Sequence, residues 1–71
     1  MTQFKLFETY YGRFITDYDL KIFKSFVKRT AKNIWDENGN RFKIHIHDGV
    51  EFIYPDGRYS FAPTIKADML V

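Results

Sequence analysis

The chain of 71 residues contains no cysteine. Neither a disulfide framework nor a cysteine-based zinc site can therefore stabilise the fold, although small secreted domains usually need such links. No apolar run approaches the ~18 residues of a membrane-spanning helix, and the N-terminal residues MTQFKLFETYY show no signal-peptide pattern. These absences predict a cytoplasmic protein that does not enter a membrane.

Motifs that mark common enzyme sites are also absent. The chain has neither a glycine-rich phosphate loop nor a G-x-S-x-G motif. His45 and His47 would point the same way on a strand, so this pair could chelate one metal ion. A zinc site needs further ligands, which only a carboxylate such as Asp48 or Glu51 could supply, and Lys43 would repel a cation. We therefore expect no enzyme, no metal site and no cofactor; a metal-dependent enzyme would need metal bound at the two histidines.

Aromatic residues, in contrast, are abundant: eight Phe, five Tyr and one Trp. This length allows one domain, residues 1–71, with a single small core, and large aromatic side chains offset that disadvantage. A homodimer or a bound partner would bury more apolar surface. Residues with AT-rich codons (Phe, Tyr, Ile, Asn, Lys) outnumber Gly, Ala, Arg and Pro, which indicates a low-GC genome, bacterial or from a phage or other mobile element.

Three turn signals divide the C-terminal half of the chain. They are Asn38-Gly39, Asp48-Gly49 and Asp56-Gly57. Asn-Gly and Asp-Gly pairs favour the positive φ angles of tight hairpins, and their spacing predicts an antiparallel meander over residues 34–62.

The segments between these turns have the pattern of half-buried strands. Apolar residues at 42, 44 and 46 alternate with Arg41, Lys43, His45 and His47. The same buried face is expected to continue through Val50, Phe52 and Tyr54 and to be closed by Tyr59 and Phe61. Residues 64–71 form either an edge strand or a loosely held tail.

Residues 17–33 are predicted to form one amphipathic helix. At 100° per residue, the apolar residues gather on one side of the helical wheel: Leu20, Phe23, Phe26, Val27, Thr30, Ala31 and Ile34. Thr16 and Asp17 are candidate N-caps. Ile34 and Trp35 either end this helix or begin a strand paired with residues 41–46, and we favour the short strand.

The N-terminal segment QFKLFETYYGRFI is rich in aromatic residues, and Gly12 suggests a bulge or a bend. We interpret this segment as one strand or a small hairpin. Together the elements predict a small α+β domain in which the helix packs on one face of an antiparallel sheet.

Positive charge is concentrated in the predicted helix. Five cations and no acid lie between Leu20 and Trp35, whereas residues 1–19 sum to −1 and residues 36–71 sum to −2. Like charges at i,i+4 on a helix repel each other, so a sequence that retains them suggests an anionic partner. The alternative is that these lysines only keep an aromatic protein in solution.

These features predict a small non-catalytic binding protein that docks a basic helix and nearby aromatic residues onto nucleic acid or a nucleic-acid-handling complex. The expected contacts are the helix ridge Lys21, Lys24, Lys28, Arg29 and Lys32, the strand stripe Arg41, Lys43, His45 and His47, and the aromatic residues Tyr10, Tyr11 and Trp35. The alternative is an inhibitor or adaptor of phage or mobile-element type, which would block an acidic or nucleic-acid-binding surface of a host protein such as a defence nuclease.

Overall fold

The computed structural model describes residues 1–14 and 21–71, and the regular elements in these ranges are all strands. The strands are β1 (Thr9–Arg13), β2 (Lys21–Arg29), β3 (Asn33–Asp36), β4 (Arg41–Lys43), β5 (His45–His47), β6 (Val50–Ile53) and β7 (Thr64–Leu70). They form one antiparallel sheet in the order β4-β3-β2-β1-β7-β6-β5. Within the described ranges, no helix is long and apolar enough to cross a membrane.

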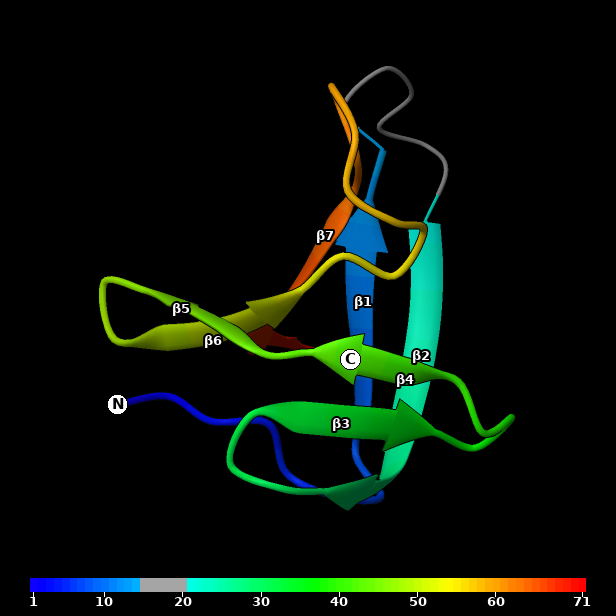
Figure 1. Ribbon diagram of the computed structural model, residues 1–71, viewed down its shortest axis with the longest axis vertical. Coiled ribbons are helices and arrows are strands. Elements are labelled where there is room, and N and C mark those ends of the chain that lie inside the picture. The colour runs from blue at the N-terminus through cyan, green and yellow to red at the C-terminus, as the bar shows by residue number, and fades with distance from the viewer. Residues whose placement is uncertain (15–20) are drawn as a thin grey trace.

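The two ends of the sheet, β4 and β5, are joined by Ile44 alone. Residues 41–47 therefore act as one bent strand, which pairs with β3 through its first half and with β6 through its second. The sheet curls into a nearly closed barrel, in which β3 to β6 cross the direction of β1, β2 and β7 (Figure 1). Such closure removes most of the unpaired edge that an open sheet would expose.

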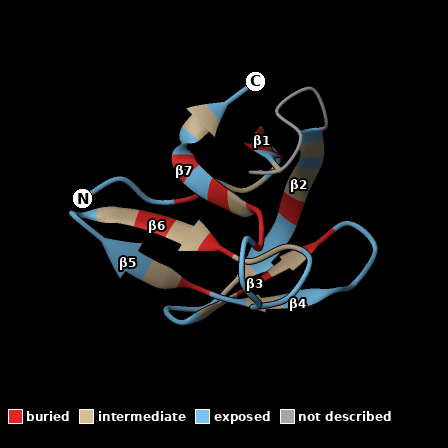
Figure 2. Cartoon of the chain, turned by 90° about the horizontal axis from the view of Figure 1, so that it is seen from above, coloured by how far each residue is buried: buried red, intermediate tan, exposed pale blue. Residues whose placement is uncertain are grey.

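Large aromatic side chains fill the barrel, as the composition predicts. The ring of Phe4 lies edge-on to Tyr10 and to Phe26, at centroid distances of 4.9 and 5.1 Å. Buried aliphatic residues complete the core: Ile34, Ile44, Ile53, Ile65 and Ala67. Figure 2 shows buried positions within β2, β6 and β7.

The predicted α+β fold, with its amphipathic basic helix at 17–33, is wrong, because residues 21–29 form β2. Residues 17–20 and the candidate caps Thr16 and Asp17 lie outside the described ranges. The register of β2 against β3 shifts between Phe26 and Lys28. This irregularity lets Phe26 and Arg29 both face the interior although they are three residues apart. Phe23 and Val27, which the helical wheel grouped with Phe26 on an apolar side, are exposed on β2.

The hairpins of the predicted meander are partly confirmed. Ile34 and Trp35 lie in β3, as favoured, and the Asn38-Gly39 turn joins β3 to β4. Asp48 and Gly49 form the loop between β5 and β6, with positive φ angles of 51° and 76° that are typical of a type I′ turn.

The expectations for residues beyond Tyr54 are only partly confirmed: Gly57 has the positive φ angle of 86° expected at the Asp56-Gly57 turn, but no closing strand follows it. Residues 59–61 form turns instead of a closing strand, and Tyr59 and Phe61 are exposed. The tail forms β7, which lies between β1 and β6 and is neither loose nor at an edge. Ile65 and Ala67 of β7 are buried, and their burial explains why this segment is held.

The N-terminal residues close one end of the barrel. Thr2 forms a parallel bridge to Val50, and Phe4 inserts into the core. The irregularity suggested by Gly12 is present, because the register of β1 against β7 shifts between Tyr10 and Gly12. A Cβ atom at position 12 would collide with the carbonyl oxygen of Thr64, so glycine is needed here for close approach of two strands.

Candidate nucleic-acid interface

Two of the cations predicted to bind a partner point into the barrel. The Nζ atom of Lys24 lies 2.9 Å from the Asp36 carboxylate. Arg29 donates from Nη1 and Nη2 to the two carboxylate oxygens of Glu51, at 2.8 and 2.9 Å. Asp36 and Glu51 are only 2% and 1% exposed. Lys24 and Arg29 therefore stabilise the fold and are not free to contact a ligand.

These interior ion pairs shift the pKa values of both acids. Burial alone would raise the pKa of Asp36, but hydrogen bonds from Lys24 and Asn40 outweigh it and hold the pKa at about 2. Burial also acts to raise the pKa of Glu51, and hydrogen bonds from Arg29 and the Phe4 amide lower it overall. Both carboxylates are thus ionised at neutral pH and hold their cations in place.

The other cations lie outside, and several gather around Trp35. Lys28 on β2 and Arg41 on β4 are the direct cross-strand neighbours of Trp35 on β3. Next to this row, Asn33 on β3 pairs with Lys43 on β4. We call this outer surface of β2, β3 and β4 the Trp35 face, and its members are Lys28, Asn33, Trp35, Arg41 and Lys43. No member is acidic, and its three cations are exposed.

The indole of Trp35 is half-buried, and Lys28 Nζ lies 4.8 Å from its ring centroid. The neighbouring residues Ile34 and Asp36 are both buried in the barrel, so the backbone of β3 directs the Trp35 side chain outward. A surface cation–π contact contributes about 0.5–1 kcal/mol, so Lys28 can leave the ring for a phosphate at small cost. Trp35 is therefore a half-buried aromatic ring between two exposed cations.

The remaining predicted contacts are scattered or buried. Lys21 and Tyr11 lie together on the outer side of β1 and β2, where Lys21 Nζ is 5.8 Å from the Tyr11 ring centroid. Lys32 is exposed in the turn between β2 and β3. Tyr10 belongs to the core with only 1% of its surface exposed, so it offers no ring to a partner.

A second aromatic group lies on the outer side of β5 and β6. The His45 ring stacks on Phe52 at 5.3 Å and meets Tyr54 edge-on at 5.2 Å. Arg58 lies 5.6 Å over the Tyr54 ring. Burial, and then the charges of Lys43 and Arg58, lower the pKa of His45 below its usual value. His45 thus offers an aromatic surface at neutral pH and not the positive charge expected of it.

Sequence reasoning placed Val50, Phe52 and Tyr54 on the buried face, and this was wrong for Phe52 and Tyr54, which lie with His45 on the outer side. A two-residue turn pairs His47 with Val50 and His45 with Phe52, so these residues share one face of the sheet. The signal was present in the Asp48-Gly49 turn, because a type I′ hairpin fixes which side chains are opposite each other. The residues of β6 that face inward are Glu51 and Ile53.

Residues 41–47 connect the Trp35 face to this second group. Arg41, Lys43 and His45 alternate with Phe42 and Ile44, as predicted, but the prediction that Ile46 is buried is wrong, because Ile46 is exposed near the tip of the hairpin. Arg41 lies beside Trp35, His45 lies on Phe52, and His47 is 3.3 Å from the exposed carboxylate of Asp48. A single outer strip therefore runs from the Trp35 face to the tip of the β5–β6 hairpin.

The described residues contain no group of three or more histidine, aspartate or glutamate side chains placed to hold a metal ion. No family model matches the chain, and no curated protein or solved structure matches it. A proposal about the function therefore rests on the arrangement of cations and aromatic rings.

Proposed function

We propose that this protein is a non-catalytic binding protein that contacts single-stranded nucleic acid through the Trp35 face. The observation that carries the proposal is the cross-strand row of Lys28, Trp35 and Arg41, in which an aromatic ring lies between two exposed cations. Proteins that bind single strands combine aromatic platforms for bases with cations for the backbone. The proposal places the protein in the cytoplasm, where nucleic acid is accessible to it.

The charge distribution supports an anionic partner on this side of the barrel. Strands β1 to β4 carry seven lysine and arginine residues and one acidic residue, the buried Asp36. With Lys24 and Arg29 paired inside, five cations of these strands remain outside, and the exposed acidic residues Glu8 and Glu37 lie just beyond the ends of β1 and β3. Three phosphate contacts, from Lys28, Arg41 and Lys43, would give a slope of log affinity against log salt of about −2.

The aromatic component favours single strands over a duplex. The bases of a duplex are stacked on one another, whereas an unpaired base has a free face that can lie on an indole ring. Stacking of this kind contributes about 1–3 kcal/mol per base and tolerates any base. The proposed binding is therefore weakly selective for sequence and strongly sensitive to salt.

The proposal is tested by measuring the anisotropy of labelled single-stranded and duplex oligonucleotides over a salt series. Trp35→Ala should weaken single-strand binding roughly 5- to 150-fold. Lys28→Glu with Arg41→Glu should abolish binding at low salt. The charge-matched control is Lys5→Glu with Arg13→Glu, because both residues are exposed and lie outside the Trp35 face.

Equal losses in the two charge-reversal pairs would contradict the location of the site, because the effect would then be one of net charge alone. Preference for the duplex would contradict the role of Trp35 as a stacking platform. Absence of oligonucleotide binding at low salt would overturn the proposal and direct the search to an acidic protein surface as partner.

A further inference from the structure

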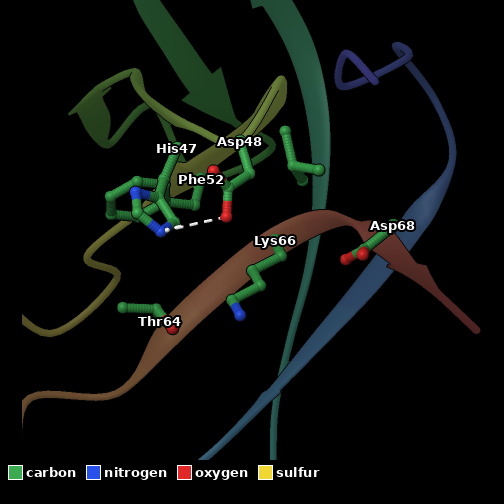
Figure 3. Close-up of a pocket in the computed structure, with 7 residues that line it drawn as sticks. His47, Asp48, Phe52, Thr64, Lys66 and Asp68 are labelled. Carbon is green, nitrogen blue, oxygen red and sulfur yellow. Dashed lines mark ion pairs between the residues drawn. The ribbon is translucent and has the colours of Figure 1, made fainter. Parts of the chain in front are cut away.

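A pocket of about 300 Å³ lies on the outer side of the barrel, between the β5–β6 hairpin and β7. Its lining residues are His47, Asp48, Val50, Phe52, Thr64, Lys66 and Asp68. Figure 3 shows His47 and Asp48 on one wall, with Thr64, Lys66 and Asp68 along β7 on the other. Pockets that bind small molecules start at about this volume, so the space suits one small ring system.

The pocket exists because β6 and β7 diverge. They are paired only at Phe52 with Lys66 and at Ile53 with Ile65. Beyond that point Val50 bridges to Thr2, and the hairpin tip turns away from β7. The backbone on the two sides of this opening is held by the pairing of β6 with β7 and by the bridge of Val50 to Thr2.

The chemistry of the pocket fits an uncharged polar ring. Phe52 and Val50 supply an apolar surface, and the Lys66 ammonium and the Thr64 hydroxyl supply hydrogen-bond donors. Asp48 and Asp68 supply acceptors, and their charges oppose the entry of an anion such as phosphate. A flat ligand with donors and acceptors on its edge, an apolar face and no net charge satisfies all of these groups.

The position of the pocket relates it to the Trp35 face. His47 lines the pocket and is the last residue of the outer strip that begins beside Trp35 at Arg41. The six residue-to-residue steps from Arg41 to His47 span at most about 20 Å, which several nucleotides of a single strand can cover. Phosphates would meet Arg41 and Lys43 along this path, and the pocket would come at its end.

We infer that the pocket receives one unstacked nucleobase of the bound strand, with the base lying on Phe52 and its polar edge directed at Thr64, Lys66 and Asp68. This inference rests on the proposed function and adds a base-binding site to it. The carboxylates exclude phosphate from the pocket, so the backbone stays on the strip and only the base enters. Because polar groups line the pocket, this position can distinguish one base from another, which the Trp35 platform does not do.

The test uses nucleosides, which lack phosphate, and inorganic phosphate as separate probes of the isotope-labelled full chain by NMR. At least one of adenosine, guanosine, cytidine and uridine should shift the amide signals of Phe52, Thr64 and Lys66 at millimolar concentration. Inorganic phosphate should instead shift signals of Lys28, Arg41 and Lys43. Absence of nucleoside shifts, or phosphate shifts within the pocket, would overturn the inference.

Two sets of variants test the pocket and the Trp35 face independently. Lys66→Met and Thr64→Val should remove the nucleoside shifts and weaken oligonucleotide binding about tenfold, the effect of losing one bound base. Lys28→Glu with Arg41→Glu should abolish oligonucleotide binding while the nucleoside shifts persist. Oligonucleotide binding that depends on Trp35 but not on Lys66 or Thr64 would overturn the base pocket and leave the proposed function standing. Nucleoside shifts without any oligonucleotide binding would overturn the proposed function instead.

Discussion

Arg29 on β2 and Glu51 on β6 meet inside the barrel in a bidentate ion pair, with N–O distances of 2.8 and 2.9 Å. The same two side chains hold the N-terminal segment, because Glu51 accepts a hydrogen bond from the Phe4 amide and Arg29 donates one to the Phe4 carbonyl. One buried pair therefore joins two strands that are not neighbours in the sheet and the segment that closes the barrel.

We predict that Glu51→Gln lowers the free energy of unfolding by about 3–5 kcal/mol, because the Arg29 charge would remain in a largely buried site without its partner. The measurement is urea unfolding followed by circular dichroism. Glu37→Gln is the matched control, since Glu37 is exposed and its change should cost less than about 0.5 kcal/mol. Similar stability of the two variants would contradict the structural role of the pair.

Asp36 should make the free energy of unfolding depend on pH in the acidic range. Its pKa in the folded protein is about 2, below the ordinary value of 3.8, so the unfolded chain binds the proton more readily. The stabilisation is complete above the ordinary pKa and is lost as the pH falls toward the folded pKa. Between about pH 5 and about pH 2 this loss amounts to about 2 kcal/mol.

Asp36→Asn removes this contribution while it keeps the shape of the side chain. The difference in unfolding free energy between the wild-type protein and Asp36→Asn should therefore shrink as the pH falls through this range. The comparison is needed because the pKa of Glu51 is also lowered and contributes an acid dependence of its own. A difference that stays constant with pH would show that the Asp36 carboxylate is not stabilised by folding.

Lys24 and Lys28 lie four residues apart on β2 and should respond to substitution in opposite ways. Lys24→Met removes the partner of buried Asp36, so we expect a loss of about 3 kcal/mol in stability and unchanged oligonucleotide affinity in the folded protein. Lys28→Met removes an exposed cation of the Trp35 face, so we expect unchanged stability and weaker binding. Thermal unfolding and anisotropy on the same two samples check both halves of the prediction, and a binding loss in Lys24→Met alone would contradict it.

Gly12→Ala should destabilise the barrel by about 2–3 kcal/mol, because its Cβ would press on the backbone of Thr64 and on Ile65. Gly39→Ala provides the comparison. Position 39 has open space but a φ of 83°, so the strain there should cost about 1 kcal/mol. Chemical unfolding of both variants measures which of them is less stable. A Gly39→Ala variant less stable than the Gly12→Ala variant would contradict the close approach of β1 and β7.

Local signals predicted the hairpins well. The turns at Asn38-Gly39 and Asp48-Gly49 depend on backbone angles that few residue types adopt, so the sequence marks them directly. Strand alternation over residues 41–47 was also visible, and with it the outward direction of Arg41 and Lys43.

The helix prediction failed because the local sequence does not show that two of the cations have ion-pair partners far along the chain. A run of cations looked like one solvated ridge, but Lys24 and Arg29 are neutralised by Asp36 and Glu51, which lie 12 and 22 residues further along the chain. The apolar residues Phe23 and Val27 looked like part of a buried helix face, but they lie on the outer side of β2. Both effects arise from barrel closure, which no local window of sequence reveals. Four residues of the candidate site, Lys28, Trp35, Arg41 and Lys43, are brought together by β2, β3 and β4 instead of by a helix, and their role in binding stays a prediction.

The most direct test of binding at the Trp35 face uses the fact that Trp35 is the only tryptophan in the chain. Its fluorescence reports on this face alone, and a base stacked on the indole should quench it. We predict that a short single-stranded oligonucleotide quenches Trp35 fluorescence at low salt, that added salt reverses the effect, and that Lys28→Glu with Arg41→Glu prevents it. Binding detected by anisotropy with no change in Trp35 fluorescence would contradict the account.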